Sequence, residues 1–286
     1  MKMAVIGCGL IGGSMALSWK RAGIVDEVIA FGHNPATLQK ALDKGAADTV
    51  TTSMEEAVKD ADIVVSAVPV EAMESVFTEM APFLKSDAVV TDVGSTRQTV
   101  IAAARKGLGD KFHQYAPAHP IAGGEMPGVD YASADLFDEK VVISTPDEGM
   151  DPKVVTFIEE AWRKAGACVQ AMSPLQHDLT FASVSHLPHV LAYALVDMIA
   201  REENAQEKLK MAGAGFRDFT RIASSSPVMW RDICLSNREA LSHELKRYRA
   251  SLDTLQKYID ESDGKALESV FENAVRNRRG LVFPGK

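Results

Sequence analysis

Four segments of the chain combine side chains that could do chemistry with small or apolar neighbours. They are Asp92-Val-Gly94-Ser95-Thr-Arg97, His119-Pro-Ile-Ala-Gly-Gly124-Glu125, Ser185-His186-Leu-Pro188-His189, and Phe216-Arg217-Asp-Phe-Thr-Arg221 with Pro227-Val-Met-Trp230 after it. Histidine, with an ordinary pKa of about 6.5, suits proton transfer near neutral pH, and an arginine guanidinium suits a carboxylate. Residue types alone leave a structural alternative: His119 could be a loop residue, and either arginine a solvated surface charge.

The spacing in the third segment raises the question of a metal site. Ser185 and His189 are four residues apart, and His186 and His189 are three apart, so a helix would group them on one side. A zinc ion needs further ligands, and the sequence offers none nearby. We therefore expect no metal.

A glycine-rich turn near the N-terminus has the pattern of a dinucleotide site. Gly7-Cys-Gly9-Leu10-Ile11-Gly12 stands between an apolar run and an expected helix from Leu10 to Ala22. In such turns the first glycine permits a tight turn, the second admits a pyrophosphate and the third allows close helix packing. The helix N-terminus then binds the anion. The alternative is a glycine-rich turn that binds nothing.

The end of the second expected strand bears on which dinucleotide binds. An acidic residue there would hydrogen-bond the ribose 2′-hydroxyl, but the segment is Phe31-Gly32-His33-Asn34. Because no carboxylate repels a 2′-phosphate and His33 and Asn34 can donate to one, we favour NADP, with NAD still possible. Further cofactor contacts are expected from the loops that contain Gly32, Val68, Pro69, Gly94 and Ser95.

Short apolar runs alternate with helical stretches through the first half of the chain. The expected strands are 3–7, 28–31, 62–68, 88–92 and 140–144, and the expected helices include 35–45, 70–84 and 151–165. Nearly continuous apolar strands joined by helices are typical of a parallel sheet covered on both faces. We therefore expect an α/β protein, with a doubly wound Rossmann sheet over residues 1–170 and an all-α domain over residues 171–286.

Helical patterns dominate after residue 172. Ser173-Pro174 is typical of a helix start, and Pro188 should kink the helix that carries it. Apolar residues spaced 4, 3, 4, 3 and 4 apart form a heptad-like stripe: Leu241, Leu245, Tyr248, Leu252, Leu255 and Ile259. Packing inside the helical domain and a dimer seam both explain this stripe, and the two are compatible.

The composition narrows the class of protein. A chain of 286 residues has room for about two domains, and a formal net charge of −8 argues against nucleic-acid or anionic-membrane partners but not against an anionic small molecule. Three widely spaced cysteines (Cys8, Cys168 and Cys234) predict neither a disulfide framework nor a zinc module. The uncharged stretch 3–19 mimics a signal sequence, but its glycines favour strand, turn and helix, and we expect no other stretch to cross a membrane. These features indicate a cytoplasmic enzyme.

In this order behind an N-terminal glycine turn, the four segments resemble those of the prephenate/arogenate (cyclohexadienyl) dehydrogenase family. The resemblance runs from Met3 to about residue 240. It implies a Rossmann domain followed by a helical dimerisation domain, in a homodimer. It also implies oxidation of prephenate or arogenate by NAD(P), with loss of carbon dioxide as the ring becomes aromatic, to give 4-hydroxyphenylpyruvate or tyrosine. We expect neither a chorismate mutase segment nor an ACT domain.

The resemblance implies roles for particular residues. His119 would handle the substrate's hydroxyl proton, with Ser95 as its hydrogen-bonding partner beside the nicotinamide. Arg221 would bind a substrate carboxylate, whereas Arg217 and His186 have no such role and are expected to be surface or structural residues. Further substrate contacts are implied for Gly124, Glu125, Ser185, His189 and Trp230, the last of which can reach the neighbouring subunit's site in this family.

Two other functions are compatible with parts of the sequence. One is another β-hydroxyacid or imine dehydrogenase, which would lack the His-Pro-Ile-Ala-Gly and Ser-His-Leu-Pro-His segments. The other is an NADP-binding sensor without turnover, against which the presence of both His119 and Arg221 argues. Ala214 stands where many relatives have glycine, so the choice between prephenate and arogenate stays open.

Overall fold

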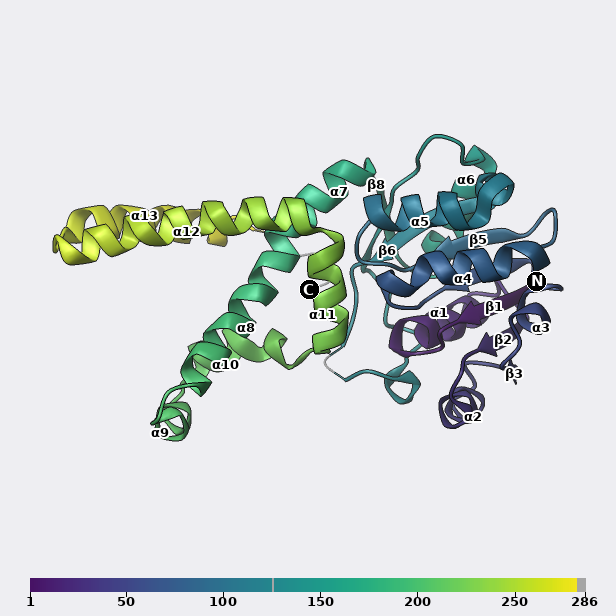
Figure 1. Ribbon diagram of the computed structural model, residues 1–286, viewed down its shortest axis with the longest axis horizontal. Coiled ribbons are helices and arrows are strands. Elements are labelled where there is room, and N and C mark those ends of the chain that lie inside the picture. The colour runs from purple at the N-terminus through teal and green to yellow at the C-terminus, as the bar shows by residue number, and fades with distance from the viewer. Residues whose placement is uncertain (125, 282–286) are drawn as a thin grey trace.

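The computed structural model describes residues 1–124 and 126–281, in which a sheet domain is followed by a set of helices (Figure 1). Within these residues eight strands form one sheet in the order β3-β2-β1-β4-β5-β6-β7-β8. The strands are β1 (Lys2–Ile6), β2 (Glu27–Phe31), β3 (Thr49–Thr51), β4 (Ile63–Ser66), β5 (Val89–Asp92), β6 (Tyr115–Pro120), β7 (Val141–Ser144) and β8 (Cys168–Ala171). Neighbours from β3 to β6 are parallel, whereas β7 is antiparallel to β6 and β8 is parallel to β7. The expected α/β class and helical second half are confirmed, with the antiparallel turn at β7 as a departure from a wholly parallel sheet.

Helices cover both faces of the sheet. Alternate residues of β1 belong to two separate apolar clusters, because side chains alternate along a strand. One face packs against helices α1 (Leu10–Arg21), α2 (Pro35–Asp43) and α6 (Pro152–Lys164), and the other against α3 (Met54–Val58), α4 (Met73–Met80) and α5 (Gln98–Leu108). On the first face Trp19 meets Trp162 edge to face, with ring centroids 5.6 Å apart. Burial on both sides explains the nearly unbroken apolar strands.

Three strands and one helix differ from the sequence-based expectation. Strands β3, β6 and β8 lie outside the expected strands. Strand β6 was not expected because it contains prolines at positions 117 and 120, and proline has no amide hydrogen to donate in a sheet. Strand β3 was not expected because it has only three residues. The expected helix 70–84 is α4 between 3₁₀ turns at Val70–Ala72 and Ala81–Phe83, because Pro82 cannot continue α-helical hydrogen bonding.

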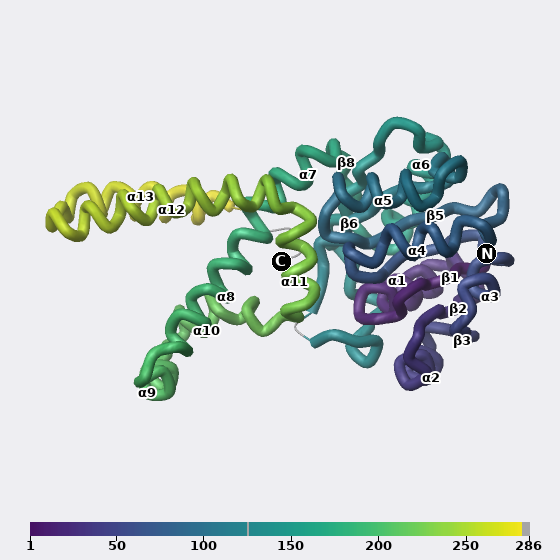
Figure 2. The backbone as a smooth tube through the Cα atoms, viewed as in Figure 1, coloured from purple at the N-terminus to yellow at the C-terminus, as the bar shows by residue number. Residues whose placement is uncertain are grey.

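The second half of the described chain is helical (Figures 1 and 2). Its helices are α7 (Pro174–Phe181), α8 (Leu187–Ala200), α9 (Ala205–Lys210), α10 (Ala214–Thr220), α11 (Pro227–Ser236), α12 (Arg238–Asp260) and α13 (Gly264–Arg279). The predicted start of α7 is confirmed, since the Ser173 hydroxyl accepts the amide of Gln176. In Figure 1, α12 and α13 lie side by side and project away from the sheet domain.

The run from α7 to α8 corrects the expectation about membrane-spanning stretches. A π-helical turn at Ala182–His186 joins the two helices, and Pro188 lies in the first turn of α8. The sequence predicted a kink at Pro188, and the structure has this wider turn next to it. The whole run Pro174–Ala200 is long and apolar enough to cross a membrane by length and composition, and 28% of its most apolar window is buried. Its first turns pack on the sheet domain through His177 and Asp178, both buried.

The apolar stripe of α12 is buried at one end only. Leu241 is 4% exposed, but Leu252 is 46% exposed and Ile259 is 58% exposed. Packing inside the helical domain therefore explains the start of the stripe at Leu241. It does not explain Leu252 and Ile259, which are exposed in the single chain.

Candidate active site

The turn after β1 is a cradle that requires glycine. Gly7 has a φ of +93°, and a methyl group there would lie 2.7 Å from the carbonyl oxygen of Ala67. A methyl group on Gly12 would lie 2.5 Å from the carbonyl oxygen of Gly7. Gly9 faces open space, because no atom of the described residues outside its own turn lies within 4 Å of a methyl group built there.

This open space lies at the N-terminus of α1. Gly9 is the N-cap residue, and no side chain of the described residues caps the helix. The amide groups of Leu10, Ile11 and Gly12 in the first turn have no partner within the helix, because such partners would precede its start. Free amides and the positive end of the helix dipole suit an anion, so the cradle fits the pyrophosphate of a dinucleotide.

The end of β2 lies beside this cradle and presents two polar side chains. Asn34 caps α2, since its Oδ1 accepts the amide of Ala36 at 2.9 Å. That leaves its amide Nδ2 for the 2′-phosphate contact expected from the sequence. His33 is exposed, and its ring packs edge to face on Phe31. Gly32 is close to Leu38, whose Cδ2 would lie 3.3 Å from a methyl group on the glycine.

Loops after β4 and β5 meet the glycine turn at the same edge of the sheet. Val68 contacts the turn, because its Cγ1 would lie 3.1 Å from a methyl group on Gly7, and Pro69 is exposed beside it. The carboxyl ends of parallel strands share one edge, so β5 brings Gly94 and Ser95 to this edge as well.

A buried ion pair shapes the loop after β5. Arg97 donates to Asp92 through both terminal nitrogens, at 2.6 and 3.1 Å, and both side chains are fully buried. Asp92 also accepts the amide of Gly94 at 2.7 Å and the hydroxyl of Tyr115. This network holds Gly94 and the partly buried Ser95 in place.

His119 lies at the carboxyl end of β6 and is hydrogen-bonded to α7. Its Nδ1 is 2.8 Å from Nε2 of His177, and Nδ1 of His177 is 2.9 Å from Oδ1 of Asp178. The ring of Phe181 packs against both imidazoles, with centroids 5.1 Å from that of His119 and 4.4 Å from that of His177. Among the described residues, the partner of Nδ1 is thus His177. The bond between His119 and Ser95 that the resemblance implied stays a prediction.

Burial leaves His119 neutral. It lowers the pKa of His119 well below its usual range, and the nearby Arg97, His177 and His186 make a positive charge on the ring less favourable still. Burial also lowers the pKa of His177, although the bond to Asp178 opposes this. Burial by itself would raise the pKa of Asp178, but hydrogen bonds from His177 and two backbone amides outweigh it, and the pKa is lowered. An ionised carboxylate thus lies behind two neutral imidazoles at pH 7.

A second group forms in the helical half. His189 stacks on Trp230, with ring centroids 3.6 Å apart, and its Nδ1 is 2.9 Å from the backbone oxygen of Ser185. Because a carbonyl oxygen only accepts, Nδ1 carries the proton and Nε2 can accept one from a ligand. Burial lowers the pKa of His189, and the positive charge of Arg221 lies close enough to lower it further. Ser185, His189, Trp230 and Arg221 are thus neighbours.

His186 is another buried histidine of the helical half, with its ring edge to face on Trp230 at a centroid distance of 6.1 Å. It is 1% exposed, and its Nδ1 is 3.2 Å from the side-chain nitrogen of Asn237. Burial lowers its pKa to about 4, and the nearby His177 and His189 rings lower it as well. Its burial and its bond to Asn237 agree with the structural role expected from the sequence.

The structure places the remaining predicted site residues differently. Gly124 lies against the cofactor turn, because a methyl group there would be 3.3 Å from Cδ2 of Leu10. Glu125 lies outside the described residues. Arg217 is exposed, as expected for a surface residue. In residues 1–124 and 126–281 no group of three or more His, Cys, Asp or Glu side chains could hold a metal ion.

Sequence reasoning missed His177 and Asp178. They lie one turn into α7, and both are buried although both are polar. Two adjacent ionisable residues at the start of an otherwise apolar helical run were the available signal.

The fold and the site define a class of protein. A Rossmann sheet with an open glycine cradle and a neutral histidine at the same edge belongs to an NAD(P)-dependent oxidoreductase. Residues 15–171 match the nucleotide-binding domain of prephenate dehydrogenase, and residues 173–273 match the prephenate dehydrogenase dimerization domain. The chain belongs to the prephenate dehydrogenase family, whose members carry out an oxidative decarboxylation in tyrosine biosynthesis.

Individual relatives agree with this assignment. The chain is 36% identical to a cyclohexadienyl dehydrogenase of Zymomonas mobilis over 281 residues, which cover 98% of this chain and 95% of the relative. It is 35% identical to a prephenate dehydrogenase of Bacillus subtilis over 98% of this chain and 76% of the relative. A crystal structure of prephenate dehydrogenase from A. aeolicus, in complex with hydroxyphenyl propionate and NAD+, superposes with a TM-score of 0.90 at 34% identity, covering 98% of each chain.

Proposed function

We propose that the protein oxidises prephenate, arogenate or both with NAD(P)+, releasing carbon dioxide and 4-hydroxyphenylpyruvate or tyrosine. The observation that carries the proposal is the position of His119. It is a neutral imidazole at the cofactor edge of the sheet, and the helical half carries His189 stacked on Trp230 with the charge of Arg221 close by. A base and a guanidinium are the two groups that binding and oxidising a hydroxy acid requires.

The chain's own residues then have the following roles. The glycine cradle would hold the pyrophosphate of the dinucleotide, and its nicotinamide would supply an acceptor for the hydride on the ring carbon that bears the hydroxyl. His119 takes the proton of that hydroxyl on its free ring nitrogen, with Ser95 close to the same edge. Arg221 binds a substrate carboxylate, and Ser185, His189, Trp230, Gly124 and Glu125 contact the substrate. The bond to the ring carboxylate breaks, its electron pair enters the ring, and His119 returns the proton to the phenolic oxygen.

We propose that NADP is preferred over NAD. Residues 32–34 carry no carboxylate that would repel a 2′-phosphate, and exposed His33 and the free amide of Asn34 can donate to one. Replacing both His33 and Asn34 with alanine should raise KM for NADP and leave KM for NAD unchanged. An equal change in both constants would contradict the preference.

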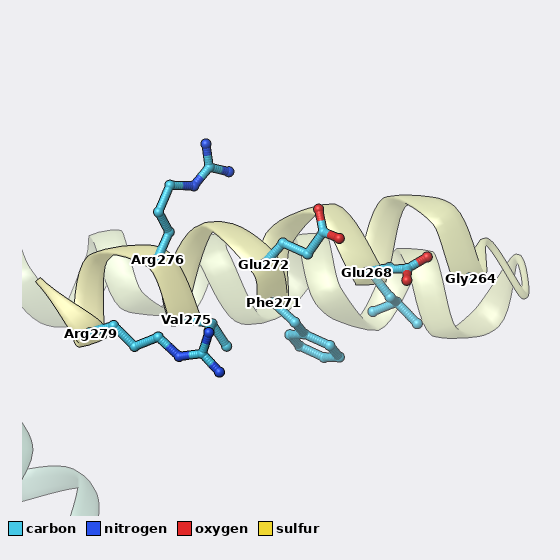
Figure 3. A pocket seen from close by; sticks show the side chains of 8 residues that line it. Gly264, Glu268, Phe271, Glu272, Val275, Arg276 and Arg279 are labelled. Carbon is cyan, nitrogen blue, oxygen red and sulfur yellow. The ribbon is translucent and has the colours of Figure 1, made fainter.

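We also propose a cytoplasmic homodimer that associates through residues 171–286, with residues 1–170 as the nucleotide-binding domain. The support is apolar surface on α12 and α13. Leu252 and Ile259 of α12 are exposed, and Phe271 and Val275 project from one side of α13, opposite Glu272 (Figure 3). Sedimentation of the full chain tests this: a dimer is expected, and aspartate at Leu252 and Ile259 should produce monomers. A wild-type monomer would contradict it.

A spectrophotometric assay tests the activity itself. Prephenate and arogenate are each combined with NADP+ and NAD+, and the absorbance of the reduced cofactor is followed. Reduction with at least one substrate is expected. If all four combinations are silent in protein that binds cofactor, the proposed substrates are wrong, and β-hydroxyacids and imines become the next to test.

A further inference from the structure

His177 of α7 links His119 to the carboxylate of Asp178, the next residue of the same helix. The three side chains form a line: Asp178 Oδ1 is 2.9 Å from His177 Nδ1, and His177 Nε2 is 2.8 Å from His119 Nδ1. His177 is 0% exposed and Asp178 is 1% exposed. A buried carboxylate next to two buried or partly buried imidazoles needs a reason, because such groups are costly to remove from water.

Asp178 is held from three directions. Its carboxylate accepts the backbone amides of Arg97 at 2.7 Å and Gln98 at 2.9 Å, at the N-terminus of α5. Its own backbone oxygen accepts the side-chain amide of Asn237 at 2.7 Å. Backbone amides and the positive end of a helix both favour the ionised form. The carboxylate is therefore a fixed acceptor.

The positions of the protons follow from this acceptor. An ionised carboxylate can only accept, so Nδ1 of His177 must carry a proton. A neutral imidazole carries one proton, so Nε2 of His177 is an acceptor, and Nδ1 of His119 must donate to it. Nε2 of His119 is then left without a proton, which is the state a base requires.

We propose that His177 and Asp178 are positioning residues for the base: they hold His119 in the tautomer whose Nε2 is free, orient that nitrogen, and stabilise the imidazolium that forms when it takes a proton. This rests on the proposed function of His119. The same logic applies wherever a carboxylate and a hydrogen bond fix the tautomer of a catalytic histidine.

Proton balance is simple. The substrate hydroxyl gives its proton to Nε2 of His119, whose Nδ1–H remains bonded to His177, and the proton returns to the phenolic oxygen after carbon dioxide leaves. No proton needs to reach Asp178. The other charged or titratable groups near His119 are Arg97 from the loop after β5, its partner Asp92 at the end of β5, and His186 from the π-helical turn. Arg97 and Asp92 form an ion pair, so the unpaired charge nearest the line is that of Asp178.

The tautomer is measured directly by NMR of ¹⁵N-labelled histidine rings in the full chain. The signals of His119 are identified by their absence in His119→Asn. We expect Nδ1 of His119 to be protonated and Nε2 unprotonated at neutral pH. A protonated Nε2 overturns the proposal, and this result does not depend on whether His119 is the catalytic base, which activity of His119→Asn decides separately.

Kinetics of two variant pairs test the consequence. Asp178→Asn should lower kcat by about 10–100-fold with KM values unchanged, and should move the acid limb of the pH profile to lower pH, because the imidazolium loses its counter-charge. Asp232→Asn is the matched control, since Asp232 is also buried in the helical half but pairs with Arg231. Equal effects of the two asparagine variants overturn the proposal.

The second pair separates hydrogen bonding from packing. His177→Gln keeps an amide oxygen that can accept from His119, whereas His177→Leu keeps only volume. We expect kcat to be at least about tenfold higher in the glutamine variant than in the leucine variant, since only the former retains the tautomer. Equal kcat values contradict a positioning role and indicate that His177 acts through packing alone.

Discussion

Replacing His119 with asparagine tests the base while disturbing little else. The amide nitrogen of asparagine lies near the position of Nδ1, so it can still donate to His177 across the 2.8 Å gap seen here. The substitution removes Nε2 and the ring carbons beside it. Because the bond to α7 is retained, we expect the fold and the cofactor cradle to be unchanged and the proton acceptor to be lost.

The size of the loss follows from the absence of a substitute among the described residues. His177 uses both ring nitrogens in hydrogen bonds, and His186 is bonded to Asn237. His189 belongs to the other group, where it stacks on Trp230 near Arg221. General acid–base catalysis contributes about 10²–10⁴-fold, or about 2.7–5.4 kcal/mol at about 1.36 kcal/mol per tenfold. We expect kcat to fall by this amount.

The assay is steady-state kinetics with NADP+ across a range of pH, together with cofactor binding and thermal unfolding. Wild-type kcat should be flat through neutral pH and fall only in acid, because the lowered pKa of His119 keeps it unprotonated until then. The variant should lose that acid limb. His113→Asn is the matched control: His113 is exposed, its Nδ1 is bonded to the backbone oxygen of Asp110, and kcat should not change.

A loss of tenfold or less in His119→Asn, with cofactor affinity and melting temperature unchanged, would refute the assignment of His119 as the base. An acid limb that persists in the variant would also refute it, because the titrating group would then be another residue.

Three further predictions concern the cofactor cradle, the substrate arginine and the pH dependence of stability. Gly9→Ala should keep the melting temperature but weaken NADP binding at least about tenfold, because its methyl group meets no protein atom but occupies the space for the pyrophosphate. Unchanged affinity by calorimetry would contradict this. Gly12→Ala should instead lower the melting temperature, because its methyl group would lie 2.5 Å from the carbonyl oxygen of Gly7. Arg221→Gln should chiefly raise KM for the substrate, and an unchanged KM would remove Arg221 from the site. The pKa of His186 falls from 6.5 to about 4 on folding. Between these two pH values the unfolded chain binds a proton that the folded chain does not. The free energy of unfolding should therefore drop by up to about 3 kcal/mol as the pH falls from 6.5 to about 4. Urea unfolding across the window measures the drop, and His186→Gln should show a smaller one.

Local patterns made much of the fold predictable. The strands of the buried centre are largely apolar on both faces, and the glycine turn is recognisable from the short spacing of its glycines. Strand β6 escaped prediction because the prolines at positions 117 and 120 are unusual in a sheet, where the pairing with β5 and β7 decides the conformation. The sequence left two explanations for the outer part of the α12 stripe, because an apolar helix face can pack within its own chain or against a second chain.

The sequence by itself determined the class of protein, the glycine cradle and the residues able to do chemistry, because these depend on residue type and short spacing. Only the tertiary structure decided the state of the base. His119 and His177 are 58 residues apart, on a strand and a helix, and folding brings Nδ1 of one to Nε2 of the other. Tautomer, protonation and pKa depend on burial and on hydrogen-bond partners, and both are properties of position in space.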